Sequence, residues 1–352
     1  MKVVLLGDTH LGARNGNQRF HTFFELFYSD VLFPYMHKHK ISQIFQLGDL
    51  WDQRKFIHVA SAAEANRYFF DNLRMHGFHM TTLLGNHDIS FRNSCEVNSS
   101  EILLGGYSDC ITVINKPTDV DFGATRALVI PWICDENAES VKAAIRLTSS
   151  PFCLSHLELQ GFEALRGHTM ETGMDPSIFK VFDCVFTGHY HHRHAKGNVL
   201  YVGTPYEMTW ADYDDPKGFH VLDTVTGDLE FIQNPYQLFK KVAYSDDMDV
   251  DLFNFEPYRA CYVRVAAASK KNFHKFEKFL DRLMSVRPYD VKVVDEVITV
   301  EVDEAVEAKE DGDTVTLIKD FVNKLTVTDT VDKEAVRKYI HNLYIEAQLS
   351  YE

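Results

Sequence analysis

Five short motifs hold the residues of this 352-residue chain whose types are best suited to chemistry. Each motif contains Asp, Asn or His, and each comes directly after an apolar run typical of a buried strand. In chain order they are Gly7-Asp8-Thr9-His10, Gly48-Asp49, Gly85-Asn86-His87-Asp88, Ser155-His156 and Gly188-His189-Tyr190-His191. Because ligands of open α/β sheets collect beyond the carboxyl ends of the strands, we expect the five motifs to meet in one crevice.

The side chains in these motifs indicate a metal centre. Carboxylate, amide and imidazole groups supply oxygen and nitrogen ligands without thiolate, which suits Mn, Fe, Zn or Mg and gives no reason to favour Cu(I). Residues two apart on a strand point the same way, so Asp8 with His10, and His189 with His191, are expected to face one centre. Asp49 stands alone beside these pairs and is the candidate for a bridging carboxylate. Two metals ~3.5–4 Å apart would clamp the attacking and leaving oxygens of a displacement at phosphorus.

The competing interpretation is that these histidines are surface or core residues with satisfied hydrogen bonds. Any one motif alone is too short to exclude it. All five motifs in this order, each after a strand, favour the metal centre. His192 and His194 extend the last motif, and we expect them to be solvated or to support the ligands.

The overall composition limits the class of protein. Hydrophobic residues make up 45% of the chain and charged residues 25%, which excludes disorder, collagen and a coiled-coil rod for most of it. The net charge of −15 argues against a simple basic nucleic-acid-binding protein, unless metals or a partner correct the local field. The apolar run at 3–6 is too short for a signal peptide, and no run approaches the ~18 residues of a membrane span. The six cysteines form no C-x-x-C pair. We therefore expect a cytoplasmic protein with reduced thiols and no membrane contact.

The spacing of apolar residues predicts the elements that position the motifs. Strands are expected at residues 3–6, 44–47, 81–84, 127–130, 152–154 and 184–186. Apolar residues recur at helical spacing in residues 20–37 and 61–76. Strands that alternate with helices in this way imply an α/β sheet with crossover helices over about residues 1–225.

A small unit is predicted after the α/β region. Residues 244–257 are acidic without any basic residue and are predicted to be a linker. Residues 258–302 carry nine Lys or Arg against six Asp or Glu, and their pattern predicts a strand, a helix at 270–284 and one or two further strands. The helix is expected to direct Phe273, Phe276, Leu280 and Leu283 into a core. Four cations share another of its faces, Lys271, Lys275, Lys278 and Arg282.

The tail combines a polar segment with two predicted amphipathic helices. Residues 303–313 form a second polar linker, and apolar stripes at helical spacing follow in 317–325 and 336–344. From residue 303 onward there are six Lys or Arg against twelve Asp or Glu. The tail is either a helical hairpin packed on its own domain or an acidic pair of helices that docks a partner.

The motif set resembles the calcineurin-like metallophosphoesterases over about residues 1–225. Gly203-Thr204-Pro205 and Lys217-Gly218-Phe219 narrow the resemblance to the SbcD-type nucleases, the small subunits of the SbcC–SbcD and Mre/Rad recombination complexes. The chain length is similar to that of the phage recombination endonucleases. The resemblance implies a β-sandwich flanked by helices (α-β-β-α) at 1–243, a small basic α+β capping domain for DNA at 258–302, and a helical tail at 303–352. It also implies a homodimer whose tail binds the coiled-coil base of an SbcC-type ABC ATPase.

The same resemblance assigns roles to individual residues. It implies one metal on Asp8, His10, Asp49 and His191, and a second on Asp49, Asn86, His156 and His189. Mn is expected first, with Mg, Fe or Zn as alternatives. His87 would be the general acid or a phosphate-contacting group, while Asp52 and Asp88 would support the centre or place DNA. Many cellular members have histidine where this chain has Asp52, which leaves the role of that position open. The four cations of the predicted helix would contact DNA phosphates, with an ordinary solvated face as the alternative. The partner contacts would be Leu317, Phe321, Tyr339 and Leu343.

The implied activity is that of a two-metal DNA exonuclease and single-strand endonuclease. It would process DNA ends in recombination, repair and replication, in a bacterial or phage-infected cell. One alternative is a metallophosphoesterase of a small phosphoester or a phosphoprotein, but such an enzyme would not need the basic unit and the tail. The other is a non-catalytic scaffold subunit, which would be expected to have lost metal ligands, yet none is missing.

Overall fold

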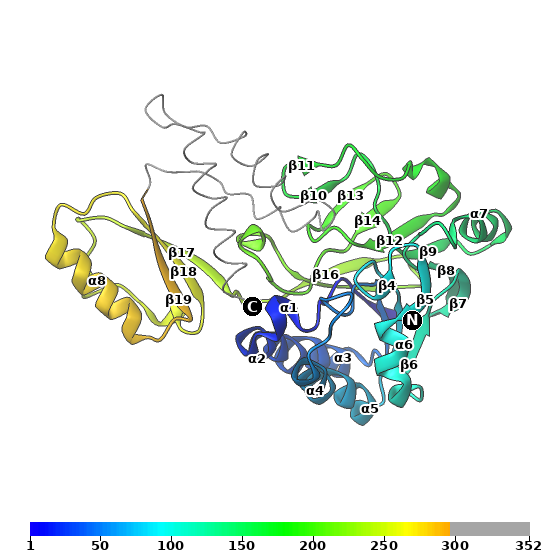
Figure 1. The fold of residues 1–352 in the computed structure, drawn as a ribbon, viewed down its shortest axis with the longest axis horizontal. Helices are drawn as coiled ribbons and strands as arrows, with labels where there is room; N and C mark the ends of the chain where they lie inside the picture. The colour runs from blue at the N-terminus through cyan, green and yellow to red at the C-terminus, as the bar shows by residue number, and fades with distance from the viewer. Residues whose placement is uncertain (296–352) are drawn as a thin grey trace, which may run out of the picture. The chain divides into compact units, whose positions relative to one another are not determined.

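Two six-stranded sheets form the larger part of the computed structural model, which describes residues 1–295 (Figure 1). The first sheet has the order β16-β15-β1-β2-β3-β6, and the second has the order β13-β14-β12-β9-β8-β7. Strands of the first sheet are β1 (Lys2–Leu6), β2 (Gln43–Gln46), β3 (His79–Leu83), β6 (Ile111–Ile114), β15 (Gly218–Asp223) and β16 (Leu229–Gln233). Those of the second are β7 (Thr118–Phe122), β8 (Thr125–Ile130), β9 (Phe152–His156), β12 (Cys184–Gly188), β13 (His194–Lys196) and β14 (Val199–Tyr201).

Each sheet contains a run of four parallel strands. In the first sheet β1, β2, β3 and β6 are parallel, and β15 and β16 run against them. In the second sheet β14, β12, β9 and β8 are parallel, and the outer strands β13 and β7 are antiparallel. The carboxyl ends of each parallel run therefore lie along one edge of its sheet. All six strands expected from the sequence are present within a few residues of their expected bounds.

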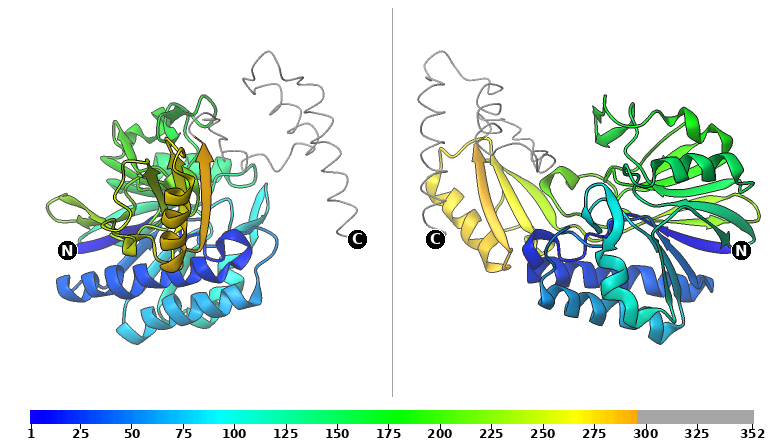
Figure 2. Two further views of the ribbon diagram at one scale, coloured as in Figure 1. Left: turned by 90° about the vertical axis from the view of Figure 1, so that its left-hand side faces the viewer. Right: turned by 45° about the vertical axis from the view of Figure 1, so that its right-hand side comes forward.

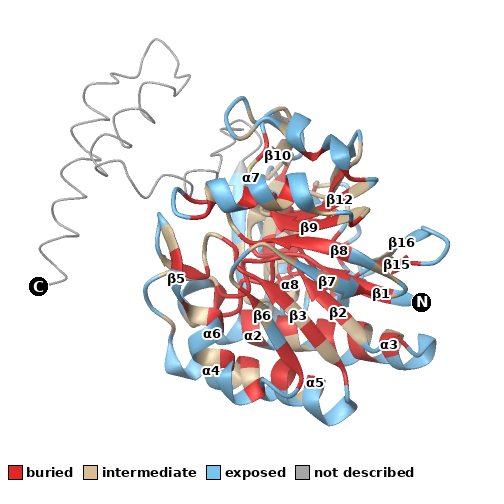
Figure 3. Cartoon of the chain, turned by 90° about the vertical axis from the view of Figure 1, so that its right-hand side faces the viewer, coloured by how far each residue is buried: buried red, intermediate tan, exposed pale blue. Residues whose placement is uncertain are grey.

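Both faces of each sheet carry apolar side chains. One face packs on the other sheet, and the opposite face packs on helices. Val3 and Leu5 point into the core between the two sheets, whereas Val4 and Leu6 point into the core beneath the helices. Figure 3 shows buried strands of both sheets stacked between helices. The α-β-β-α sandwich implied by the resemblance is thus confirmed.

Two long helical stretches cover the outer face of the first sheet. One consists of α2 (Gln18–Phe27), the π-helical η1 (Tyr28–Leu32) and α3 (Phe33–His39). The other consists of α4 (Val59–Ala65), the π-helical η2 (Asn66–Phe70) and α5 (Asp71–His76). They confirm the two predicted helices. On the second sheet, α7 (Ala138–Leu147) buries Val141 and Ile145.

Shorter elements connect these layers. They are α1 (Ala13–Gly16), β4 (Ile89–Phe91), β5 (Ser94–Asn98), α6 (Ser99–Leu104), η3 (Gly105–Tyr107), β10 (Glu163–Leu165), β11 (His168–Thr169), η4 (Pro176–Val181), η5 (Trp210–Asp212) and η6 (Glu256–Tyr258). All six cysteines are free thiols. Within residues 1–295, no helix is long and apolar enough to cross a membrane.

A small α/β unit follows the sandwich. Three parallel strands, β17 (Phe239–Tyr244), β18 (Tyr262–Ala267) and β19 (Asp290–Asp295), form its sheet, and helix α8 (Phe273–Ser285) lies along one side (Figure 2). The expected linker at 244–257 belongs to this unit, because it joins β17 to β18 and buries Val250 and Phe255 in their core.

The predicted core face of α8 needs one correction. Phe273 is 65% exposed, because it is the first residue of the helix, and the buried stripe consists of Phe276, Phe279 and Leu283. Leu280 packs beside this stripe and is partly buried.

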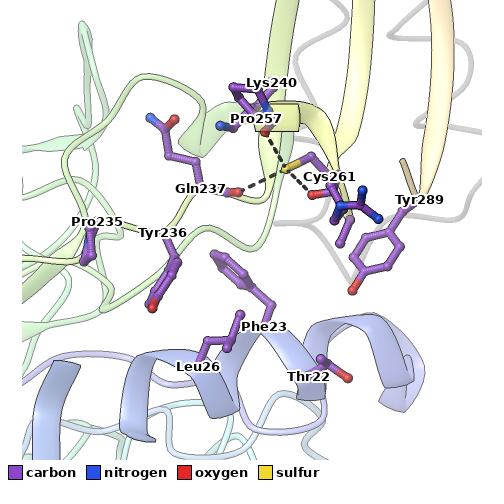
Figure 4. Close-up of a pocket in the computed structure, with 12 residues that line it drawn as sticks. Thr22, Phe23, Leu26, Pro235, Tyr236, Gln237, Lys240, Pro257, Cys261 and Tyr289 are labelled. Carbon is purple, nitrogen blue, oxygen red and sulfur yellow. Dashed lines mark hydrogen bonds between the residues drawn. The ribbon is translucent and has the colours of Figure 1, made fainter. Parts of the chain in front are cut away.

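The small unit contacts helix α2 directly. The Arg19 guanidinium lies over the Tyr289 ring, 5.0 Å from its centroid, and donates to the Tyr289 carbonyl at 2.8 Å. Phe20 contacts Tyr262 with ring centroids 5.9 Å apart. Figure 4 shows the hollow beside these contacts, with Phe23 and Leu26 of α2 on one side. The predicted partner contacts Leu317, Phe321, Tyr339 and Leu343 lie outside the described residues.

Candidate metal centre

Five strand ends bring the predicted ligands together. Asp8 follows β1, Asp49 follows β2 and Asn86 follows β3, so the parallel run of the first sheet supplies three residues. The second sheet supplies His156 at the end of β9, with His189 and His191 just beyond β12. His10 completes the set of seven, and its side chain is buried with those of Asp8, Asp49 and His156.

Three of these seven residues have an uncommon backbone conformation. His10, Asp49 and His189 have φ angles of 42°, 50° and 93°. Positive φ is unfavourable for residues other than glycine and is found where the surrounding structure enforces it, often at functional sites. Here it turns the chain sharply out of the strands so that the side chains face one another.

Two glycines make the close approach of the strand ends possible. A Cβ at Gly85 would lie 2.1 Å from Asp49 Oδ1, and a Cβ at Gly188 would lie 2.3 Å from Asp8 Oδ1. Any side chain at either position would displace a predicted ligand.

The first group of donors consists of Asp8, His10 and His191. The Nε2 atoms of His10 and His191 lie 3.1 Å apart, and His191 Nε2 is 3.9 Å from Asp8 Oδ2. One donor atom from each of the three residues falls within 4.8 Å of the others. Two imidazole nitrogens and a carboxylate therefore converge on one point.

The second group consists of Asp49, His156 and His189, with Asn86 beside them. Asp49 Oδ2 lies 3.2 Å from His156 Nε2. Asn86 Oδ1 is 3.1 Å from His156 Nε2 and 3.0 Å from His189 Nδ1. Both the carboxylate and the amide oxygen thus face the same two imidazoles.

Asp49 lies within reach of both groups. The carboxylate atom that faces His156, Oδ2, is also 3.8 Å from His10 Nε2. Its other oxygen, Oδ1, accepts the backbone N–H of His87 at 2.8 Å. One buried carboxylate therefore connects the two sets of donors.

Hydrogen bonds from outside the centre orient the donors. His156 Nδ1–H donates to the Leu47 carbonyl at 2.8 Å, which directs Nε2 toward Asp49. The backbone N–H of His189 donates to Asp8 Oδ2 at 2.9 Å. Asp88 faces away from the donors, because its carboxylate accepts backbone N–H groups from Leu50, Trp51 and Gly85. Through these hydrogen bonds, Asp88 links the segment after β2 to the segment after β3.

His87 and Asp52 lie at the margin of the centre. His87 Nδ1–H donates to the Asp52 carbonyl at 2.6 Å, and the His87 ring stands edge-on to His10 with centroids 4.9 Å apart. Asp52 Oδ1 is 3.4 Å from His10 Nδ1. A donor atom of His87 also falls within 4.8 Å of His10 and Asp49, so proximity alone does not separate a ligand from a neighbouring acid.

Burial and the neighbouring carboxylates shift the pKa values of several groups in the centre. Burial raises the pKa of Asp8 to about 7. Burial alone would lower the pKa of His10 and His156, but the carboxylates of Asp52 and Asp49 at His10, and of Asp49 and Asp8 at His156, raise both to about 9. Protons on these imidazoles therefore balance buried carboxylates.

The donor set fits divalent cations. It offers imidazole nitrogens, carboxylates and one amide oxygen without thiolate, a combination suited to Mn, Fe or Zn. Burial and the neighbouring His156 hold the pKa of His189 well below its usual range, and burial lowers that of His191 to about 3, so both rings are neutral and able to bind a metal. Bound cations would supply the charge that protons supply in their absence.

Some contacts of the centre were not predicted. Arg54 Nε donates to the Asn86 carbonyl at 2.9 Å, and the Trp132 ring lies 5.1 Å from the His189 ring, centroid to centroid. Arg54 lies two residues after Asp52, and this closeness to a predicted site residue could have indicated it. Trp132 follows β8, and no feature of the sequence pointed to it as part of the centre. His192 pairs with Asp215 at 2.8 Å and is thus a supporting residue.

Three of the four predicted cations lie on α8 and are engaged within the small unit, whereas Lys271 precedes the helix, which corrects its predicted place on the helix face. Lys278 and Arg282 pair with Asp251 at 2.7 and 2.9 Å, and Lys275 Nζ donates to the Asp246 carbonyl. The backbone N–H of Lys271 donates to Asp246 Oδ2 at 3.0 Å. Lys278 and Arg282 remain about half exposed.

The comparisons with known proteins come from sequence and from structure. Exonuclease subunit 1 of Enterobacteria phage T4 is 32% identical to this chain over 349 residues, which cover 99% of both chains. No family model matches the chain. A structure described as that of a novel archaeal phosphodiesterase matches 66% of this chain and 100% of its own, with 12% identity and a TM-score of 0.35. That value is too low to support a conclusion, so the phage protein is the informative relative.

Proposed function

The chain belongs to the calcineurin-like metallophosphoesterases as an SbcD-type nuclease subunit, and from this premise we propose that it is a two-metal-dependent DNA phosphodiesterase. The observation that carries the proposal is the buried Asp49 carboxylate, which lies between two groups of nitrogen and oxygen donors. A carboxylate between two donor groups suits a pair of ions about 3.5–4 Å apart.

We assign the seven donors to two ions. Asp8, His10, Asp49 and His191 would hold one, and Asp49, Asn86, His156 and His189 would hold the other. When bound, two divalent ions act as Lewis acids toward phosphoryl oxygens and lower the pKa of water. Mn is our first choice, with Mg, Fe and Zn as alternatives that the donor set also suits.

His87 would act beside the ions rather than bind one. Its Nδ1–H is held by the Asp52 carbonyl, so Nε2 is the nitrogen left for a substrate. From this position it would protonate the departing sugar oxygen, a contribution that is typically 10²–10⁴-fold. The Asp52 main-chain carbonyl would fix the tautomer and orientation of the ring, while the Asp52 carboxylate faces His10.

DNA is the proposed substrate. The relative from phage T4 is named an exonuclease, and residues 258–302 carry nine Lys or Arg against six Asp or Glu in a protein of net charge −15. We propose that the chain has exonuclease and single-strand endonuclease activity and processes DNA ends in recombination, repair and replication. The cytoplasm of the bacterial or phage-infected cell is the compartment in which this DNA lies.

Assembly with other subunits is part of the proposal. The phage T4 relative is named a subunit, and a coiled-coil ABC ATPase of the SbcC type is the partner we propose. The sandwich, which ends before β17, would then be the nuclease domain, the small unit from β17 onward the capping domain, and 303–352 the segment that binds the ATPase. We also propose a homodimer.

One set of assays tests the proposed function against its alternatives. Duplex DNA, single-stranded DNA and p-nitrophenyl phosphate esters are incubated with the full chain, with Mn and with EDTA. We expect Mn-dependent cleavage of DNA that EDTA abolishes. Hydrolysis of only the small esters would indicate a small-substrate phosphoesterase, and no hydrolysis by a metal-loaded protein would indicate a scaffold. Anomalous scattering from crystals grown with Mn should give two adjacent peaks beside Asp49.

A further inference from the structure

Lys217 is a buried cation next to the metal centre that the proposed reaction does not use. It precedes β15, and only 4% of its side chain is exposed. Its Nζ donates three hydrogen bonds, to Asp212 Oδ1 at 2.7 Å, to Asp215 Oδ2 at 2.8 Å and to the His191 carbonyl at 3.0 Å. All three ammonium protons are therefore used, and one bond reaches the backbone of a proposed metal ligand.

The two carboxylates are themselves held, Asp212 from within its own loop and Asp215 by His192. Asp212 Oδ2 accepts the backbone N–H groups of Met208 and Thr209, both at 2.9 Å. Asp215 Oδ1 accepts from His192 Nδ1–H at 2.8 Å. Lys217 thus connects the loop at 208–217 to the main chain of His191 and, through Asp215, to the side chain of His192.

The same loop also reaches the partner imidazole of His191. The buried Tyr206 hydroxyl donates to the Thr9 carbonyl at 2.7 Å, one residue before His10. The Tyr206 ring is fixed by stacking on Phe24, with centroids 3.9 Å apart. His10 and His191, whose Nε2 atoms face each other, are therefore both held from residues 206–217. The second donor group is oriented elsewhere, by the bond from His156 to the Leu47 carbonyl.

Stability alone does not account for such a network. Buried ion pairs contribute little net stability, because desolvation offsets the attraction, and well-packed apolar residues often replace them without loss. Apolar residues in place of this network would not form the hydrogen bond that fixes the position of the His191 main chain. We propose that Lys217 is a positioning residue for His191 and thereby for the ion of the Asp8–His10–His191 group. This inference rests on the proposed two-metal function.

Calorimetric titration of the purified, metal-free full chain with Mn tests the inference. The wild-type chain should bind two ions. In Lys217→Met, we expect the affinity of one ion to fall 10–100-fold, the range typical for loss of a group that orients a ligand, while the other ion binds as before. Because the single change leaves two carboxylates without their cation, Lys217→Met with Asp215→Asn is made as well. The double variant keeps the net charge of the network and should show the same selective loss.

A control separates positioning from general destabilisation. Phe279→Leu, in the core of the small unit, should lower the melting temperature without changing either Mn affinity. Unchanged Mn binding in both Lys217 variants would overturn the inference, and so would equal weakening of both ions or recovery of affinity in the charge-balanced double variant. A wild-type chain that binds fewer than two ions would instead contradict the proposed function itself.

Discussion

The backbone and the carboxylate of Asp49 are both held by their surroundings. Its backbone is in the left-handed region, one carboxylate oxygen accepts the N–H of His87, and the other faces His156 and His10. The position is therefore fixed on three sides, and a substitution there removes a donor from both proposed metal sites without leaving a group that could replace it.

Loss of the Asp49 carboxylate should abolish cleavage. We expect Asp49→Ala to reduce DNA hydrolysis to background and to weaken both ions, because each loses the shared ligand. Metal content and cleavage are measured on the same preparation. Asn86→Ala serves as the comparison, because its oxygen faces only His156 and His189 and its loss should affect one ion preferentially. Full activity of Asp49→Ala with unchanged metal content would exclude the bridging role.

His87 allows binding to be separated from chemistry. His87→Ser should retain both ions and DNA affinity but lose about 10²–10⁴ in turnover, the range expected for a general acid. Calorimetry with Mn and a DNA-binding assay accompany the rate measurement. Because a His87 nitrogen lies near His10 and Asp49, loss of an ion in this variant would show that His87 is a ligand and that the acid must be sought elsewhere.

Metal affinity should rise with pH. In the metal-free chain the pKa of His10 and of His156 is about 9, so both imidazoles are protonated at pH 7 and must lose a proton to bind. Apparent Mn affinity should therefore increase as pH rises from 6 toward 9, and binding at pH 7 should release protons. Titration at pH 7 in two buffers of different ionisation enthalpy measures that release. Identical heats in both buffers would contradict the expectation.

At the scale of elements, the sequence predicts the strands and helices in which apolar residues recur at a regular spacing. The six strands and two long helices follow from apolar spacing, and the seven donors follow from the strand ends, as Asp8 after β1 and Asn86 after β3 illustrate. The positive φ of Asp49 and His189 was not predictable, because only the packed strand ends enforce it. The network of Lys217 was missed because its bond to the His191 carbonyl, 26 residues away in the sequence, forms only in the folded chain.

The small unit shows where a local pattern misleads. An acidic composition predicted a linker at 244–257, but composition does not reveal that β17 joins the small sheet and that Val250 and Phe255 fill its core. On α8 the apolar spacing allowed Phe273 in the stripe, yet a residue at the first position of a helix has no preceding turn to pack beside.

Phe276→Ala should cost about 3–5 kcal/mol of stability, whereas Phe273→Ala should be nearly neutral in a thermal melt.

The cations of α8 give a test of DNA contact. Replacement of Lys271, Lys275, Lys278 and Arg282 by Gln should weaken DNA binding and reduce its salt dependence, because fewer counterions are released. Two of them pair with Asp251, but exposed pairs of this kind are weak and can exchange a carboxylate for a phosphate. Lys142→Gln with Arg146→Gln on α7, compared with Lys278→Gln with Arg282→Gln, is the control matched in charge. Equal salt slopes for both variants would indicate a solvated face.

At the scale of the whole molecule, the distribution of charge matters more than its sum. A chain of net charge −15 repels DNA at long range, yet two divalent ions add four positive charges at the centre. Residues 258–302 have a local excess of three cations, but residues 244–257 of the same unit hold five Asp or Glu and no Lys or Arg, which offset it. Residues 303–352 hold twelve Asp or Glu against six Lys or Arg. This acidic excess suits a tail that engages a protein rather than DNA.

The tail provides the test of that division. Its two apolar stripes follow an acidic segment at 303–313, a separator that a tail needed only for its own core would not require. In the full chain, Leu317→Glu with Tyr339→Glu should abolish binding to an SbcC-type ATPase, because each change places a charge on a predicted contact face. Metal binding and intrinsic DNA cleavage should remain.

Truncation after Glu310 should reproduce the effect of these two charges. Co-purification with the ATPase, a thermal melt and a cleavage assay are carried out on both variants. If the stripes serve the enzyme's own core, the truncated chain will aggregate or melt much earlier, and the double variant will lose stability together with activity. If they form the docking face, both variants will keep the melting temperature of the intact chain and lose only the partner and any ATP-dependent stimulation. Retained ATPase binding by either variant would exclude the docking role, since no second apolar stripe pair is predicted in residues 303–352.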